Sequence, residues 1–340
     1  MSTDSHRIRL AGADVEFACA PDDTLLRAAQ RAGLGFPYEC NVGSCGNCKF
    51  ELVDGEVANA WPQAPGLSDK DRQRQRHLGC QSQPQGDCVV KLRTMARYVP
   101  PHRPQRAPAV LHSVHALTHD ISEFRFTLDT PLVFEPGQYA LAWLPGVVGP
   151  RAYSMSNITE RLDGPGECHF QVRRVNGGGG SAALFDLQPG ARIEIDGPYG
   201  MAWLRRDAPR DILCLAGGSG LAPMVSIARG AMTEPQLAGR QLHFIYGGRT
   251  AADICGQDLL QALPGYGTRL HYSAFVSNAA DDSSAYPVGF VHEAALQLHG
   301  ERLRDLEIYF AGPPAMANAV QAMLLAAGVP PDQQHFDQFY

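Results

Sequence analysis

The stretch Tyr38-Glu39-Cys40-Asn41-Val42-Gly43-Ser44-Cys45-Gly46-Asn47-Cys48 places three cysteines in a C-x4-C-x2-C pattern, and Cys80 follows further along the chain. This spacing is typical of a [2Fe–2S] cluster, for which one tight loop supplies three thiolates and a distant residue the fourth. Gly43 and Gly46 suit such a loop, because glycine adopts positive φ freely and lets backbone N–H groups point at the sulfurs. Zinc is the alternative metal, but zinc sites usually combine two short ligand pairs, and Cys80 stands alone. We therefore predict that Cys40, Cys45, Cys48 and Cys80 bind a [2Fe–2S] cluster.

Length and composition restrict the rest of the chain. At 340 residues, with 44% hydrophobic and 19% charged residues, it has the composition of a globular protein of two or three domains. A formal net charge of −6 argues against nucleic acid as a partner. The N-terminus has no apolar signal segment and no apolar run is long enough to span a membrane, which predicts a cytoplasmic protein without membrane contact. Nine cysteines without an export signal predict no disulfide framework.

The first segment, residues 1–95, surrounds the cysteine loop with strand and helix patterns. Alternating residues predict a hairpin before a helix that Asp22 or Asp23 caps and Gly33 ends. Further strands are expected at 50–53 and 89–92, and a basic helix at 71–77 that would either dock an acidic partner or form a solvated face. The order of these elements and all four cysteine positions resemble the β-grasp fold of plant-type ferredoxins.

Residues 96–106 are rich in proline and polar residues, which predicts a semi-extended interdomain linker that leaves the flanking domains some freedom. Residues 107–206 then alternate short β-rich runs with turn signals, as in an antiparallel β-barrel. The expected strands are 110–117, 124–128, 139–144, 169–175 and 192–195.

Two motifs in this barrel have the chemistry of a cofactor site. In Arg151-Ala152-Tyr153-Ser154, the arginine and the tyrosine face the same side of a strand, where they can offer a guanidinium to a phosphate and a ring to a flavin. In Asn176-Gly177-Gly178-Gly179-Gly180-Ser181, glycines lead into a predicted helix whose N–H groups can receive a diphosphate. Each motif alone is weak, since the first occurs by chance and the second also fits a flexible hairpin.

The third segment, residues 207–340, alternates strands and helices, which predicts a doubly wound parallel sheet. The strand at 211–216 leads into Gly217-Gly218-Ser219-Gly220-Leu221-Ala222-Pro223, a glycine-rich turn of the kind that binds nucleotide phosphates. Pro223 replaces the third glycine of the usual motif and is acceptable early in a helix. Two later strands end at Gly247-Gly248-Arg249 and at Ala311-Gly312-Pro313-Pro314.

Together, these barrel and sheet motifs resemble the ferredoxin–NADP reductase superfamily. The resemblance implies that Arg151, Ala152, Tyr153 and Ser154 bind FAD, and that Gly178, Gly179, Gly180 and Ser181 bind its diphosphate. It also implies a nicotinamide nucleotide site formed by Gly217, Gly218, Ser219, Gly220, Pro223, Gly247, Arg249, Gly312 and Pro313. Ser154 and the terminal aromatics Phe339 or Tyr340 are then expected beside the flavin ring as catalytic residues, although a terminal aromatic is often only a frayed tail.

The complete chain resembles the reductase components of bacterial multicomponent aromatic-ring oxygenases, and residues 56–67 especially resemble toluene monooxygenase reductases. Because a nicotinamide gives two electrons and the cluster accepts one, FAD is expected between them. The expected partner is a separate Rieske or di-iron oxygenase component, or an intermediate ferredoxin, docked at the cluster loop. Alternatives are a cytochrome P450 or deoxysugar dehydrase as acceptor, or a non-catalytic redox sensor. NADH is favoured over NADPH, because Arg249 is a single cation with Asp253 close behind, and a monomer is expected.

Overall fold

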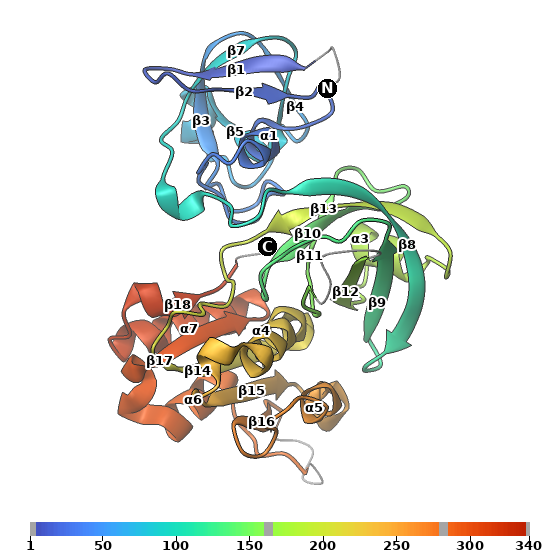
Figure 1. Ribbon diagram of the computed structural model, residues 1–340, viewed down its shortest axis with the longest axis vertical. Helices are drawn as coiled ribbons and strands as arrows, with labels where there is room; N and C mark the ends of the chain where they lie inside the picture. Colours follow the sequence, from blue (N-terminus) through green and yellow to red (C-terminus); the bar gives the residue numbers. More distant parts are fainter. Residues whose placement is uncertain (1–4, 160–165, 279–284, 338–340) are drawn as a thin grey trace.

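The computed structural model describes residues 5–159, 166–278 and 285–337, which form three domains in chain order (Figure 1). The N-terminal domain lies at one end of the molecule, and the barrel and the C-terminal α/β domain lie side by side below it (Figure 1). Within the described ranges, no helix is both long and apolar enough to cross a membrane.

The N-terminal domain is a β-grasp fold, in which α1 packs against a mixed sheet of order β2-β1-β7-β3-β5. The elements are β1 (His6–Leu10), β2 (Glu16–Cys19), α1 (Leu25–Arg31), β3 (Lys49–Asp54), β4 (Val57–Asn59), α2 (Asp69–Gln73), β5 (Arg76–Leu78), β6 (Ser82–Pro84) and β7 (Cys88–Lys91). Helix α1 is capped by Thr24 and not by the predicted Asp22 or Asp23. Asp23 instead pairs with Arg27 and Arg31 of the helix.

The predicted basic helix at 71–77 is wrong in its position. Helix α2 spans Asp69–Gln73, and Gln75 then adopts a φ of 52° that ends it before strand β5. Ser68 and Asp71 form a capping box, which starts the helix two residues before the predicted beginning. Asp71 is buried and pairs with Lys49 on β3, so this helix is anchored to the sheet through its acidic residue.

The middle domain is an antiparallel barrel of order β11-β10-β13-β8-β9-β12. Its elements are β8 (Gln105–Ala116), β9 (Ile121–Leu128), β10 (Tyr139–Trp143), β11 (Arg151–Ser154), β12 (Gly166–Arg173), α3 (Gly179–Phe185) and β13 (Arg192–Tyr199). A bridge between Met155 and Phe170 joins the edge strands β11 and β12 and closes the barrel.

The C-terminal domain has a fully parallel sheet of order β16-β15-β14-β17-β18, as predicted for a doubly wound fold. Its strands are β14 (Asp211–Gly217), β15 (Leu242–Gly248), β16 (Leu270–Val276), β17 (Leu306–Ala311) and β18 (Gln334–His335). Its helices are α4 (Leu221–Thr233), α5 (Gln257–Gln261), α6 (Val291–His299) and α7 (Pro314–Ala326).

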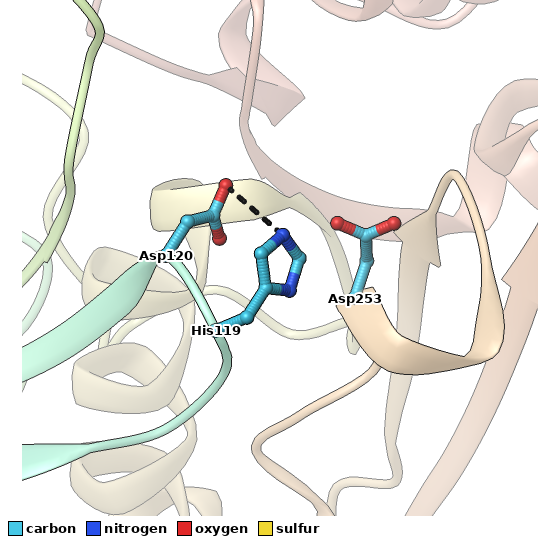
Figure 2. Close-up of side chains that lie close together, drawn as sticks. All are labelled: His119, Asp120 and Asp253. Atoms are coloured by element: carbon cyan, nitrogen blue, oxygen red, sulfur yellow. Dashed lines mark ion pairs between the residues drawn. The ribbon is translucent and has the colours of Figure 1, made fainter.

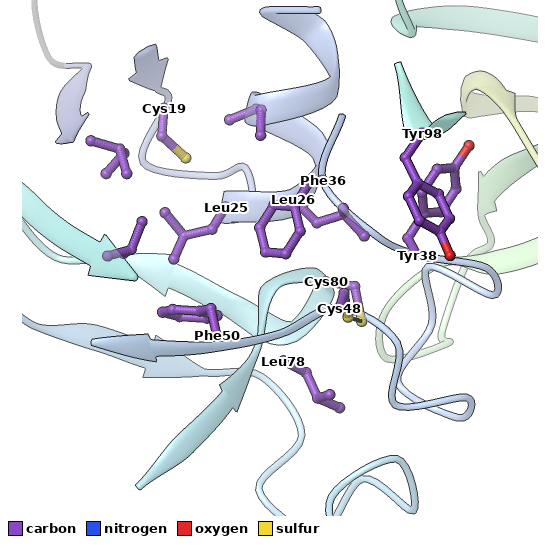
Figure 3. Packing of buried hydrophobic residues seen from close by; sticks show 14 of the residues in the cluster. Cys19, Leu25, Leu26, Phe36, Tyr38, Cys48, Phe50, Leu78, Cys80 and Tyr98 are labelled. Carbon is purple, nitrogen blue, oxygen red and sulfur yellow. Dashed lines mark hydrogen bonds between the residues drawn. The ribbon is translucent and has the colours of Figure 1, made fainter. Parts of the chain in front are cut away.

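The N-terminal domain packs against the barrel through a shared hydrophobic core. The barrel residues Tyr139, Leu141 and Tyr199, all fully buried, belong to the same cluster as the core of the β-grasp fold. Tyr98, inside the predicted linker, is also buried in this cluster, and Figure 3 shows it beside Tyr38 at the edge of the N-terminal core. Strand β8 begins within the predicted linker, at Gln105. The connection is therefore partly folded into both domains and is not simply a spacer.

Candidate functional site

The cysteine loop gathers the four predicted cluster ligands at the edge of the N-terminal core. Cys40, Cys48 and Cys80 are buried and Cys45 is half-buried. The Cys48 and Cys80 sulfurs lie 3.4 Å apart (Figure 3), and the Cys45 N–H donates to the Cys40 sulfur at 3.3 Å. The side chain of Cys45 and the backbone N–H groups of residues 42, 44 and 45 lower the pKa of the Cys40 thiol to about 6, although burial opposes them.

The glycines of this loop are required by their surroundings. Gly43 and Gly46 have φ of 94° and 78°, and a Cβ on Gly46 would lie 2.5 Å from the Gly66 carbonyl oxygen. Gly66 in turn donates its N–H to the Gly43 carbonyl at 3.0 Å, so residues 60–67 cover the cysteine loop. A Cβ on Gly43 would meet the Trp61 ring, which is 43% exposed. Spacing alone did not reveal this covering loop.

A cavity of about 720 Å³ lies between the barrel and the C-terminal domain. The two barrel motifs meet there, because a Cβ on Gly180 would lie 2.8 Å from the Arg151 side chain. The cavity wall includes these predicted residues: Arg151, Ala152, Tyr153, Ser154, Gly178, Gly179, Gly180, Ser181, Gly217, Gly218, Ser219, Gly220, Pro223, Gly312 and Pro313. Gly247 and Arg249 are not part of this wall, although Gly247 pairs with Gly217 at the same sheet edge.

The glycine-rich turn after β14 lies directly against the end of β17. A Cβ on Gly220 would lie 2.1 Å from the Ala311 carbonyl oxygen, and one on Gly217 would lie 2.6 Å from the Met316 sulfur. Only glycine permits this close approach, which leaves helix α4 opening toward the cavity. The geometry is that of a nucleotide phosphate site at the carboxyl edge of a parallel sheet.

Asp337 is a cavity residue that the sequence analysis missed. Its Oδ1 accepts a hydrogen bond from the Met201 N–H at 2.8 Å. Burial, with a smaller contribution from nearby Glu39, raises the pKa of Asp337 to about 7, although the N–H groups of Met201 and Ala202 and the charge of Arg205 oppose the shift. In the C-terminal segment, only the aromatic residues Phe339 and Tyr340 were predicted to lie beside the flavin, and Asp337 was not. Phe339 and Tyr340 lie outside the described residues.

A second cavity, of about 560 Å³, opens on the other side of Arg151. Val147 and Val148 line it from the loop before β11, and Ala182 and Asp186 line it from α3 and the residue after it. Arg151 and Gly179 line both recesses, which therefore adjoin each other, and the smaller one was not predicted. Together they offer room for an extended dinucleotide.

His119, Asp120 and Asp253 lie close together where the barrel meets the C-terminal domain (Figure 2), with potential ligand atoms within 4.8 Å of one another. The acids already have cationic partners: Arg173 lies 3.1 Å from Asp120, and Arg249 lies 3.6 Å from Asp253. Because guanidinium groups at this distance oppose a bound cation, the group is an ion-pair network between the domains.

The residues fit the cofactors that the motifs imply. Four clustered thiols with a backbone N–H directed at one sulfur are a suitable donor set for a [2Fe–2S] cluster. The glycine cradle against Arg151 and the two recesses suit a flavin dinucleotide, and the turn at Gly217–Gly220 suits a second nucleotide.

Profiles of three known families match the chain in the same order. The "2Fe-2S iron-sulfur cluster binding domain" matches residues 8–85, the "oxidoreductase FAD-binding domain" residues 108–203, and the "oxidoreductase NAD-binding domain" residues 214–322. Fold, site and matches define the class of the protein: an oxidoreductase that uses a [2Fe–2S] cluster, FAD and a nicotinamide nucleotide.

Similar proteins extend over almost the whole chain. Ferredoxin–NAD(P)+ reductase CarAd of Metapseudomonas resinovorans is 39% identical, over 95% of this chain and 96% of its own. The ferredoxin–NAD+ reductase component of the alkene monooxygenase system of Xanthobacter autotrophicus is 38% identical, over 95% and 97%. A solved structure, the ferredoxin reductase in carbazole 1,9a-dioxygenase, superposes with a TM-score of 0.90 at 35% identity, covering 99% of both chains. The Amycolatopsis cytochrome P450 reductase GcoB gives 0.81 at 30% identity, covering 98% of both. The chain belongs to this family of ferredoxin–NAD(P)+ reductases, and it transfers electrons from a nicotinamide nucleotide.

Proposed function

We propose that this chain is the reductase component of a multicomponent oxygenase that hydroxylates an aromatic compound. Its electrons pass to a separate terminal oxygenase component, or to an intermediate ferredoxin. One observation carries this proposal: the cavity shared by the flavin and nucleotide motifs is bounded by Asp337, which accepts a hydrogen bond from the Met201 N–H. The preceding residue, Gly200, donates its N–H to the Tyr38 hydroxyl, two residues before the first cysteine of the loop. The three redox sites implied by the sequence are thus contiguous in one chain.

We assign cluster binding to Cys40, Cys45, Cys48 and Cys80. We assign FAD to Arg151–Ser154 and to 178–181, and the nicotinamide nucleotide to 217–220, Pro223, Gly312 and Pro313, with Gly247 and Arg249 at its outer edge. The family matches support domain limits of 1–95, 107–206 and 207–340. When bound, FAD supplies the conversion of a two-electron hydride donor into single electrons.

The chain's own residues orient these groups and exclude water. Arg151 Nη1 donates to the carbonyl oxygens of residues 148, 149 and 150, at 3.1–3.2 Å, which fixes its guanidinium between the two recesses. The close approach of Gly220 to Ala311 joins the two strand ends that face the nucleotide. Asp337, with its raised pKa, holds a proton on a substantial fraction of molecules near neutral pH, which reduces the charge buried beside the cavity. No general acid–base pair is needed.

NADH is the proposed donor. A 2′-phosphate requires a concentration of positive charge at the end of the second strand of the sheet. Arg249 occupies that region, but it lies 3.6 Å from the buried carboxylate of Asp253, so its charge is partly neutralised. The same geometry predicts weaker use of NADPH.

A cytochrome P450 is the second candidate acceptor, because a P450 reductase superposes over nearly the whole chain. A non-catalytic redox sensor is disfavoured, since a sensor has no use for an intact nucleotide turn and flavin cavity. Either protein acceptor would approach the exposed side of the cysteine loop, where Asn47 and Trp61 reach solvent.

The test is reduction of cytochrome c and of dichlorophenolindophenol by the purified protein with NADH or NADPH. We expect both acceptors to be reduced with NADH, and more slowly with NADPH. Absence of turnover with both nucleotides would contradict the proposal. Addition of candidate Rieske, di-iron or P450 components would then identify the acceptor.

A further inference from the structure

Tyr139 connects the wall of the flavin cavity to the cysteine loop. It is the first residue of β10 and pairs with Ser154 across the antiparallel β10–β11 register. Directly opposed residues of an antiparallel pair project from the same face of the sheet. Ser154 lines the cavity, so Tyr139 lies beside the strand end that we assign to the flavin.

At its other end, Tyr139 contacts the N-terminal domain. Its hydroxyl donates a hydrogen bond to the backbone carbonyl oxygen of Glu39, the residue before Cys40. Tyr139 is fully buried, so water does not compete for this bond. Burial also raises the pKa of Tyr139 well above its usual range, which keeps the hydroxyl protonated and able to donate.

A second hydrogen bond joins the two domains in the opposite direction. The Gly200 N–H of the barrel donates to the Tyr38 hydroxyl of the N-terminal domain at 3.0 Å. The rings between these bonds are packed together: Tyr199 lies 5.9 Å from Tyr139 and 6.4 Å from Tyr38, between ring centres. The residues immediately before Cys40 are thus held from both sides.

Building on the proposed reductase function, we propose that Tyr139 is a positioning residue for electron transfer within the chain. Its hydroxyl fixes the Glu39 carbonyl, and with it the Cys40 end of the cysteine loop, against the strand end at Ser154. In each transfer the flavin side loses one electron and the cluster side gains one, with NADH as the source. No bond forms or breaks in Tyr139, which keeps its proton. Its contribution is the distance and the fixed orientation of the two sites.

The experiment compares Tyr139→Phe with a closely matched control, Tyr199→Phe. Both changes remove one hydroxyl from a fully buried ring of the same cluster. The Tyr199 hydroxyl has no hydrogen-bond partner among the residues that the structure describes, so its loss leaves the contact with Glu39 in place.

Two measurements are made on the holoprotein. Stopped-flow absorbance follows flavin reduction by NADH and the subsequent reduction of the cluster. Hydrogen exchange, which requires no turnover, follows peptides containing residues 38–41 and 198–201. For Tyr139→Phe we expect cluster reduction to slow several-fold and exchange in both peptides to rise roughly tenfold, the effect of one buried hydrogen bond. Flavin reduction and direct dye reduction should be unchanged, and Tyr199→Phe should match the wild type.

If Tyr139→Phe matches Tyr199→Phe in both measurements, the proposal is overturned. Should Tyr139→Phe fail to fold, Tyr38→Phe tests the same domain interface by removing a hydroxyl from the N-terminal domain. Faster exchange at 198–201 with slower cluster reduction then supports the proposal, and wild-type values overturn it. A wild type that does not oxidise either nucleotide contradicts the proposed function separately, because the exchange comparison does not depend on turnover.

Discussion

Replacement of Arg31 by alanine should weaken the interface between the N-terminal domain and the barrel. Arg31, in the last turn of α1, donates two hydrogen bonds to the Asp196 carboxylate of β13, at 2.9 and 2.7 Å. The Asp196 side chain is fully buried, whereas Arg31 is 27% exposed. Arg31 also donates to the Pro104 carbonyl in the connection between the domains, at 3.1 Å, and to the buried Asp23 carboxylate of its own domain, at 2.9 Å. Asp23 keeps Arg27 as a partner when Arg31 is replaced, so Asp196 is the acid left without its arginine.

The magnitude follows from the burial of the partner left behind. Removal of one member of a buried ion pair costs about 3–5 kcal/mol, because the remaining charge stays unpaired. The partial exposure of Arg31 places the expected loss near the lower end, at about 3 kcal/mol. Replacing Asp196 as well removes the unpaired charge, so the double variant Arg31→Ala/Asp196→Ala should recover part of this loss.

Urea unfolding measures the loss, and paired acceptor assays report its effect on function. Arg31→Ala should reduce cytochrome c more slowly while it reduces dichlorophenolindophenol normally, because only electron transfer through the cluster depends on the interface between the N-terminal domain and the barrel. Arg7→Ala is the control: it breaks an exposed pair with Asp87 within the N-terminal domain and should change stability by less than about 1 kcal/mol. Equal effects of Arg31→Ala and Arg7→Ala on both assays would refute the reasoning.

Two further predictions concern the cavity. Asp337 has an ordinary pKa of 3.8 and a folded pKa of about 7, so the proton that it keeps stabilises the fold fully below pH 3.8, and this stabilisation is lost progressively as the pH rises to 7. Asp337→Asn should therefore flatten the fall in the free energy of unfolding, measured with urea, between about pH 4 and 7, and an unchanged slope would show that another group is responsible. Gly220→Ala should displace the turn from Ala311 and raise the KM for NADH at least tenfold, at a cost of about 1–3 kcal/mol in stability. Gly239→Ala, where a Cβ meets open space, should behave as wild type; a normal KM for Gly220→Ala would argue against this nucleotide site.

The cofactor motifs could be predicted from the sequence because each is local. The C-x4-C-x2-C loop and the glycine turns depend on residues within about a dozen positions, and strand alternation located most of the sheets. The position predicted for the helix, 71–77, was wrong because Ser68 and Gln75 set the ends of the helix. The prediction followed the basic run beside these two residues instead.

The packing of the N-terminal domain against the barrel could not be predicted in the same way. Arg31 and Asp196 are 165 positions apart, and Tyr139 and Glu39 are 100 positions apart. In the sequence, Arg31 is an ordinary basic residue near a helix end and Tyr139 an ordinary strand aromatic. Their roles depend on which face of the barrel the N-terminal domain covers, and no local pattern specifies that face.

The most direct test of the central claim is the ratio of cytochrome c reduction to dye reduction in Cys45→Ser, measured with NADH. The control is Cys88→Ser, which changes an equally small buried thiol away from the loop, hydrogen-bonded only to carbonyl oxygens among the described residues. If electrons leave through the cluster, Cys45→Ser loses cytochrome c reduction and retains dye reduction, while Cys88→Ser keeps both. Undiminished cytochrome c reduction in a Cys45→Ser protein that lacks the cluster absorbance would contradict the account.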